Sequence, residues 1–266
     1  KLDIQGFFMH INKQILFDRL RPFIEINYTQ HDKDLLLDLC RKVVFNNSTS
    51  DCLIKGEKYN WKGLPRNKSL FHSPDRVGLP IGNLTSQVFA NFYMDAFDHY
   101  VKHDLGIKYY GRYVDDFVIV HPSKKYLATL QLKLFRFLQN ELHLKIHPKK
   151  VYLQHYKKGV KFVGAVIKPN RIYIANRTKG NMYDAISKFN AIARTQKINP
   201  NNVDALLCSM NSYLGIMKHY KSYKIRKIMT KKGLSGWWWN HVYVSGGATK
   251  LVKKNKKVRS KLLVNY

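Results

Sequence analysis

The chain has 266 residues, and 45% of them are hydrophobic, which excludes a disordered protein and allows a sizeable folded core. Its 47 Lys and Arg against 17 Asp and Glu give a formal charge of +30, so we expect a polyanionic partner. Three scattered cysteines without a C-x-x-C pair argue against a disulfide framework, and no apolar run approaches the about 20 residues of a membrane span.

The first part of the chain predicts one short strand and two helices. A strand over residues 2–4 is followed by helical periodicity over 7–20, which Pro22 should end. A second helix is predicted over 32–44, and residues 45–78 predict a hairpin and a loop. The second helix should bury an apolar stripe of Leu35, Leu36, Leu39 and Val43.

The middle of the chain alternates helices with strand-like runs. A Gly- and Pro-containing turn over 78–87 leads into a helix that ends at about Asp104, with Thr85 or Ser86 as its N-cap. Two apolar runs then flank Tyr113-Val114-Asp115-Asp116 and predict a tight hairpin. The helix is expected to bury Val88, Phe89, Phe92, Ala96 and Phe97. The hairpin is followed by a helix over 124–142, a strand over 144–150 and a second hairpin over 160–174.

The end of the chain is helical and basic. Helices are predicted over 177–194 and 202–229, followed by three tryptophans at 237–239 and a Lys-rich segment from Lys250 to Lys261. A boundary near 170–176 therefore divides an α+β part from a helical part. The order of elements in the first part predicts an antiparallel sheet with helices packed on one face.

The paired acids Asp115 and Asp116 are the main candidates for chemistry. A solvated turn explains them, since Asp favours turns. In the predicted sheet, however, Asp3 ends a strand that can lie beside the hairpin tip. Three carboxylates without His or Cys suit Mg²⁺, with Mn²⁺ as an alternative, and two such ions would serve in-line phosphoryl transfer. Because neighbouring strand residues point to opposite faces, we rank Asp115 above Asp116.

Five motifs occur in a fixed order along the chain. They are Asp3–Phe8, Gly78–Gln87, Tyr113–Asp116, Leu144–Lys150 and Phe162–Gly164. In this order and spacing the sequence resembles the palm of reverse transcriptases. The resemblance implies a right-hand polymerase palm over 1–174, with a fingers-like insertion at about 45–77, and a helical thumb and basic tail over 175–266.

The remainder of the family's fingers is missing from this sequence, which begins two residues before Asp3. The fingers lie in a part not included, or they are absent. In the second case we expect little polymerase activity, because nothing would close over the nucleotide.

The turn Gly-Leu-Pro-Ile-Gly-Asn-Leu-Thr-Ser-Gln, residues 78–87, separates types of reverse transcriptase. Group II intron and retron enzymes usually have Pro-Gln-Gly where this chain has Pro80-Ile81-Gly82. The turn is similar to that of diversity-generating retroelement enzymes, which copy a template RNA into cDNA with errors, chiefly at adenines. The alternatives are a group II intron-like enzyme, a defence-associated enzyme and a non-catalytic nucleic-acid-binding remnant.

The resemblance assigns catalytic and nucleotide-binding roles by motif position. The catalytic set is Asp3, Asp115, Asp116 and Lys150, and the metal set is Asp3, Ile4, Asp115 and Asp116. The nucleotide-binding set is Ile4, Phe7, Phe8, Pro80, Ile81, Gly82, Gln87 and Tyr113. Phe8 matches a steric gate against the ribose 2′-OH, and the alternative is a core residue on an amphipathic helix. Ile81 replaces a polar positioning residue, which implies low fidelity, or it packs beneath the turn.

Further roles concern the nucleic acid and the leaving group. Phe162, Val163 and Gly164 match the primer grip, and Asn83 and Ser86 are expected to bind template or primer. Lys150 can neutralise or protonate the leaving pyrophosphate, and Lys149 is an equal candidate by chemistry. The tryptophans at 237–239 can stack on bases or pack in a core.

The expected partners are a template RNA, a DNA primer or cDNA, dNTPs and, by resemblance, a basic accessory protein. No membrane is expected, because the positive charge is not carried by a long amphipathic helix. The resemblance implies a cytoplasmic protein of a bacterium or phage.

Overall fold

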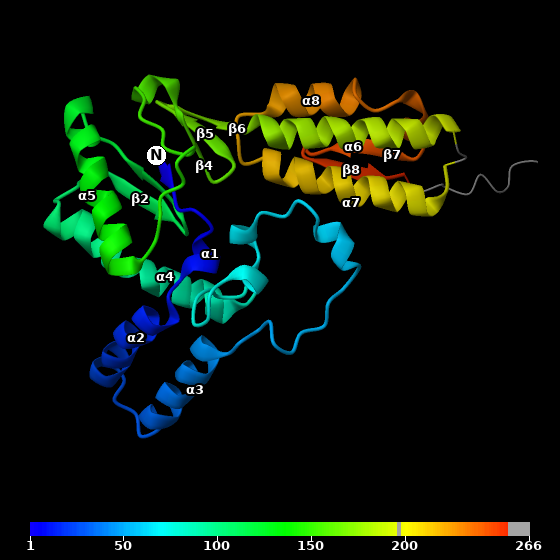
Figure 1. Ribbon diagram of the computed structural model, residues 1–266. Helices are drawn as coiled ribbons and strands as arrows, with labels where there is room; N and C mark the ends of the chain where they lie inside the picture. The colour runs from blue at the N-terminus through cyan, green and yellow to red at the C-terminus, as the bar shows by residue number, and fades with distance from the viewer. Residues whose placement is uncertain (196–197, 255–266) are drawn as a thin grey trace, which may run out of the picture. The chain divides into compact units, whose positions relative to one another are not determined.

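The computed structural model describes residues 1–195 and 198–254, which form two compact units, Lys1–Gln154 and His155–Tyr266 (Figure 1). Both combine helices with small antiparallel sheets, so the predicted α+β class is confirmed. Within the described ranges, no helix has the length and apolarity that a membrane crossing requires. The Lys-rich segment predicted at 250–261 lies outside the described residues from position 255 onward.

The sheet of the first unit has the strand order β1-β3-β2, with both pairs antiparallel. Its strands are β1 (Leu2–Asp3), β2 (Tyr110–Tyr113) and β3 (Asp116–Ile119). The predicted hairpin is therefore present as β2 and β3, and the strand that carries Asp3 pairs with it as expected.

The first predicted helix is two helices, α1 (Phe7–His10) and α2 (Lys13–Asn27). Asn12 separates them, because its side chain accepts hydrogen bonds from two backbone N–H groups of the first turn of α2. The prediction that Pro22 ends the helix is wrong, since α2 continues through it. Burial on both sides of the proline holds the helix together, at Leu16, Leu20 and Ile24.

Helix α3 (Lys33–Phe45) has the predicted extent, but its buried face differs from the prediction. The side chains of Leu35, Leu39 and Val43 are 58%, 49% and 46% exposed, whereas Val44 is fully buried. The segment after α3 was predicted to contain a hairpin and instead forms three 3₁₀ turns, η1 (Lys58–Trp61), η2 (Arg66–Lys68) and η3 (Leu70–His72).

Helix α4 (Leu84–His99) continues into a π-helical turn, η4 (Tyr100–Asp104). Its N-cap is Asn83, without a side-chain capping bond, so the prediction of Thr85 or Ser86 as the cap is wrong. Val88 is 56% exposed rather than buried. Helix α5 (Lys124–Leu142) has the predicted bounds, and the Ser123 side chain caps it by accepting from the Tyr126 N–H.

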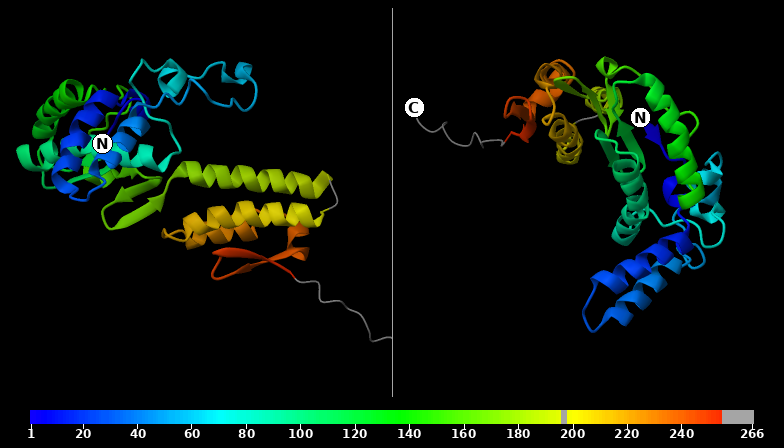
Figure 2. Two further views of the ribbon diagram at one scale, coloured as in Figure 1. Left: turned by 90° about the horizontal axis from the view of Figure 1, so that it is seen from below. Right: turned by 90° about the vertical axis from the view of Figure 1, so that its left-hand side faces the viewer.

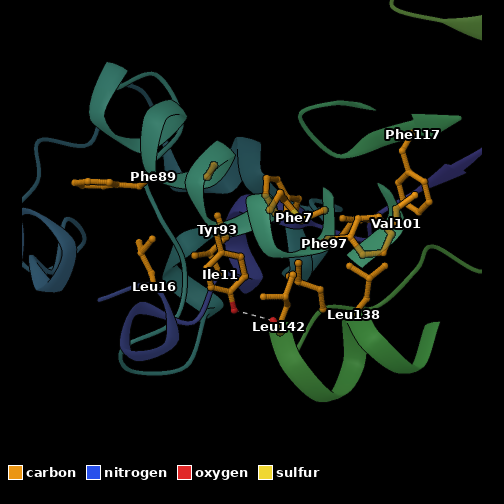
Figure 3. Close-up of a cluster of buried hydrophobic side chains, with 14 of the residues drawn as sticks. Phe7, Ile11, Leu16, Phe89, Tyr93, Phe97, Val101, Phe117, Leu138 and Leu142 are labelled. Carbon is orange, nitrogen blue, oxygen red and sulfur yellow. Dashed lines mark hydrogen bonds between the residues drawn. The ribbon is translucent and has the colours of Figure 1, made fainter. Parts of the chain in front are cut away.

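The core of the first unit lies where α4 and α5 pack with the sheet and α1 (Figure 3). Tyr93 is fully buried in it, and its hydroxyl donates to the Leu142 carbonyl at 2.7 Å. This bond satisfies a carbonyl at the C-terminal end of α5 that has no partner within the helix. The largest buried members of the core include Phe97, Phe117, Ile4, Ile11, Leu134 and Leu138.

The second unit begins with a 3₁₀ turn, η5 (Tyr156–Lys158), and a meander of β4 (Val160–Phe162), β5 (Ala165–Lys168) and β6 (Arg171–Ile174). Three helices follow, α6 (Asn176–Thr195), α7 (Pro200–Met217) and α8 (Tyr223–Lys231). The single helix predicted over 202–229 is therefore two helices, α7 and α8. The turn η6 (Gly236–Asn240) precedes a hairpin of β7 (Val242–Ser245) and β8 (Lys250–Lys253). Figure 2 shows α6 and α7 side by side with this hairpin against α7.

Candidate active site

The candidate site is built on the hairpin of β2 and β3 and on its neighbour β1. Asp3 of β1 lies directly opposite Asp116 of β3, one position from the pair of Leu2 and the fully buried Phe117. Tyr113 also pairs with Asp116 and so closes a two-residue turn at Val114 and Asp115. The fold thus brings all three predicted aspartates to one end of the sheet.

The turn itself is held in a demanding conformation. Val114 has a φ of +56°, a left-handed value that β-branched residues rarely adopt and that costs about 1–3 kcal/mol. The Ile4 N–H donates to the Asp115 carbonyl at 3.3 Å, which ties the turn to β1. Burial, with the charges of Asp3 and Asp116, raises the pKa of the Asp115 carboxyl, while a bond from its own backbone N–H opposes the shift.

Two lysines neutralise the other two carboxylates. The Lys150 Nζ lies 2.9 Å from both oxygens of Asp3, and the Lys1 Nζ lies 2.9 Å from Oδ2 of Asp116. The hydrogen bond to Asp3 raises the pKa of the Lys150 ammonium. The second oxygen of Asp116, Oδ1, is buried and has no hydrogen-bond partner in the described part of the chain.

Lys150 reaches Asp3 through the segment after α5. The predicted strand over 144–150 is reduced to a single bridge between Ile146 and Ile4. The His147 N–H donates to the Asp3 carbonyl at 2.8 Å, and the Lys150 N–H donates back to His147 in a turn. This turn directs the Lys150 ammonium to the carboxylate, whereas the Lys149 side chain forms no ion pair in the described part of the chain.

The carboxylates are not arranged as a metal centre in this structure. Across residues 1–195 and 198–254, no group of three or more His, Cys, Asp or Glu side chains has the geometry to hold an ion. The donor chemistry nevertheless suits Mg²⁺, because the site offers hard oxygen ligands and a buried carboxylate oxygen without a partner. The two lysines occupy the positions that a cation would compete for.

A network of hydrogen bonds between β2 and α4 supports the hairpin, and it was not predicted from the sequence pattern. Arg112 of β2 binds both carboxylate oxygens of Asp98 on α4, at 2.9 and 2.5 Å, and Asp98 also accepts from the Tyr110 hydroxyl. The same guanidinium donates to the Val114 carbonyl at 2.9 Å and so holds the turn before Asp115. Tyr110 and Arg112 are two positions apart on a strand, so their side chains point to the same face of the sheet. This spacing is the sequence feature that could have indicated that they act together.

The Gly78–Gln87 turn is attached to α1. The Leu79 N–H donates to the Phe8 carbonyl, and the Gly78 N–H donates to the Ile11 carbonyl, both at 2.8 Å. Ile81 is 71% exposed, so the alternative that it packs beneath the turn is excluded. Gly82 has a φ of +111° and open space around it.

The remaining predicted nucleotide and template residues differ in exposure. Phe7 is buried in the core, and Phe8 is partly buried with its ring 5.4 Å from that of Phe7. Ser86 is 3% exposed, which leaves little of its side chain for a template. Pro80 is half-buried, and the side chains of Asn83, Gln87 and Tyr113 are exposed.

The predicted primer grip belongs to the second unit. Phe162 ends β4, and Val163 and Gly164 form the turn to β5 with φ values of +45° and +74°. Consecutive left-handed residues are typical of tight type I′ hairpins. In the same unit Trp238 is fully buried and packs in the core, whereas Trp237 is 63% exposed.

A short antiparallel sheet that presents two adjacent aspartates at the end of a hairpin, beside a third from the neighbouring strand, is the palm arrangement of a nucleic-acid polymerase. The family model described as reverse transcriptase (RNA-dependent DNA polymerase) matches residues 1–167, and the chain belongs to this family. It is therefore an RNA-directed DNA polymerase domain, whose substrates are a template nucleic acid and dNTPs. No curated protein matches the chain.

Proposed function

We propose that this polymerase is of the diversity-generating type and copies a template RNA into cDNA with frequent errors. The observation that carries the proposal is Ile81, an apolar side chain that is 71% exposed in the turn attached to Phe8. Most reverse transcriptases place a polar side chain at the matching position, where it contacts the incoming nucleotide. Without that contact, the site positions the correct nucleotide less firmly, and it therefore discriminates less well between correct and incorrect nucleotides.

The proposed catalytic group is Asp3, Asp115 and Asp116, with Ile4 contributing through its main chain, because its side chain has no ligand atom. When bound there, Mg²⁺ supplies charge neutralisation of the phosphates and activation of the attacking hydroxyl. Phe8 is proposed to exclude the ribose 2′-OH, since its main-chain carbonyl is bonded to the nucleotide turn and its side chain is only partly buried.

Lys150 is proposed to act on the leaving pyrophosphate. Its pKa is raised, so the ammonium is charged at neutral pH and acts first as a cation that neutralises developing charge. The ion pair with Asp3 supports this role, because any cation that takes over the carboxylate releases the ammonium toward the phosphates.

The proposal is tested by sequencing cDNA made by the wild type and by Ile81→Gln on one RNA template. A regained hydrogen bond is worth about 0.5–1.5 kcal/mol, so we expect errors at template adenines to fall by up to about tenfold. Ile81→Leu keeps the apolar character and serves as the matched control. Equal error rates for Ile81→Gln and wild type would contradict the assignment of low fidelity to this residue.

The alternative types of reverse transcriptase are distinguished by the same error measurement. A group II intron-like or defence-associated enzyme would show low error at adenines in the wild type and no response to Ile81→Gln. The basic accessory protein expected from the resemblance stays a prediction, which co-purification of the native complex tests.

A further inference from the structure

The segment between α3 and the nucleotide turn combines exposed rings with positive charge. Residues 53–72, which we term the aromatic-basic segment, contain five Lys or Arg and a single acid, Glu57. They form the three turns η1, η2 and η3 rather than a packed hairpin (Figure 1). Neither the catalytic group nor the core of the first unit uses these side chains.

The aromatic side chains of this segment are unusually exposed. Tyr59 is 73% exposed, Phe71 is 45% exposed and Trp61 is 36% exposed. The Trp61 and Phe71 rings lie 5.3 Å apart and are tilted by 48°, so they support each other while keeping exposed surface. Large rings normally gain from burial, so three exposed rings close in sequence call for a ligand with flat apolar faces.

Four cations of the segment carry their charge without an acidic partner in the described part of the chain. Lys55, Lys62, Arg66 and Lys68 are exposed, and no ion pair involves them within the described ranges. Protein interfaces are depleted in lysine at their centres, so this composition fits a protein partner poorly. Rings interleaved with unpaired cations instead match a strand whose bases stack and whose phosphates need neutralising.

The segment is anchored beside the catalytic strand. A Cβ at Gly6 would lie 2.5 Å from the Asn67 carbonyl oxygen, so η2 approaches α1 as closely as a glycine allows. The Ser73 hydroxyl donates to the Met9 carbonyl at 3.0 Å, which fixes the end of η3 to the same helix. Helix α1 starts four residues after Asp3, and the contact between the Trp61 and Phe71 rings links η1 to the anchored η3.

We infer that the aromatic-basic segment is a stacking platform for the single-stranded template RNA that has not yet been copied. Paired bases in a heteroduplex keep their faces covered, so only unpaired bases can use the rings. The inference rests on the reverse transcriptase family of the chain and does not depend on error-prone copying.

The test measures binding of the full-length protein to a primer–RNA heteroduplex, with and without a single-stranded 5′ template extension of about 10 nucleotides. Without dNTPs, fluorescence anisotropy reports binding alone, so the result is independent of fidelity. The extension should increase the affinity of the wild type. Tyr59→Leu should reduce that increase by roughly 5- to 100-fold, while Tyr59→Phe, which keeps the ring, should retain it.

The controls separate stacking from other effects. Tyr109 is 59% exposed at the far end of the β2 hairpin, and Tyr109→Leu should bind both substrates as the wild type does. Affinity for the heteroduplex without extension should be unchanged in Tyr59→Leu. The platform is refuted if Tyr59→Leu binds the extended substrate as tightly as the wild type does, or if it loses affinity for both substrates equally. In either case a protein partner would better explain why these rings are exposed.

Discussion

Arg112 offers the most quantitative test of how the fold supports the turn that carries Asp115. Its guanidinium donates to four acceptors: the two carboxylate oxygens of Asp98, the carbonyl of Val114 and the side-chain oxygen of Asn91. Arg112→Met keeps most of the buried stem but removes every donor. We expect both a less stable first unit and a less well positioned Asp115.

The expected cost follows from the burial of the pair. The side chains of Arg112 and Asp98 are 10% and 25% exposed, so removing the arginine leaves a largely buried carboxylate without its cation. Such losses cost about 3–5 kcal/mol when burial is complete, and partial exposure reduces the estimate to about 2–4 kcal/mol. Arg112→Lys keeps the charge but not the planar fork, and should cost about 1–3 kcal/mol.

Hydrogen exchange of the backbone amides in α4 and β2 measures this loss in the first unit alone. The double variant Asp98→Asn with Arg112→Met should cost less than the sum of the two single variants, because they share one interaction. A loss below about 0.5 kcal/mol for Arg112→Met, the level of an ordinary surface substitution, would refute the reasoning.

Two further predictions concern stability. Tyr93→Phe removes the buried hydroxyl that donates to Leu142 and should cost about 1–3 kcal/mol in urea unfolding, whereas the more exposed Tyr126→Phe should cost under about 0.5 kcal/mol; equal losses would contradict this account of the α5 terminus. The raised pKa of Asp115 means that its charge opposes folding above the pKa of an unfolded Asp, about 3.9, so Asp115→Asn should melt higher than wild type at neutral pH without Mg²⁺. The two melting temperatures should converge as the pH falls toward about 4, and a constant difference would show that charge is not the cause.

The hairpin of β2 and β3 could be predicted because its signals are local. Two runs of apolar, β-branched and aromatic residues around Asp115 and Asp116 define a hairpin, and the order of elements places the strand of Asp3 beside it. The choice between Lys149 and Lys150 could not be made from sequence, since it depends on a turn from His147 that forms only when the segment pairs with β1.

The errors have physical causes beyond local preference. Pro22 lies inside α2 because burial on both sides of it outweighs the lost hydrogen bond. Helix α3 offers two overlapping apolar faces, and the packing that buries Val44 and leaves Leu39 exposed is decided by tertiary contacts. The network of Arg112 joins α4 to β2 across a distance in sequence that no local pattern spans.

Primer extension on an RNA template tests the central claim most directly. The full-length protein and its Asp115→Asn variant are compared with Mg²⁺ and with EDTA, using dNTPs. The account predicts Mg²⁺-dependent cDNA synthesis by the wild type and a loss of at least about 100-fold in the variant, since a carboxylate of the proposed metal site is removed. Equal extension by both proteins, or extension that persists in EDTA, would contradict it.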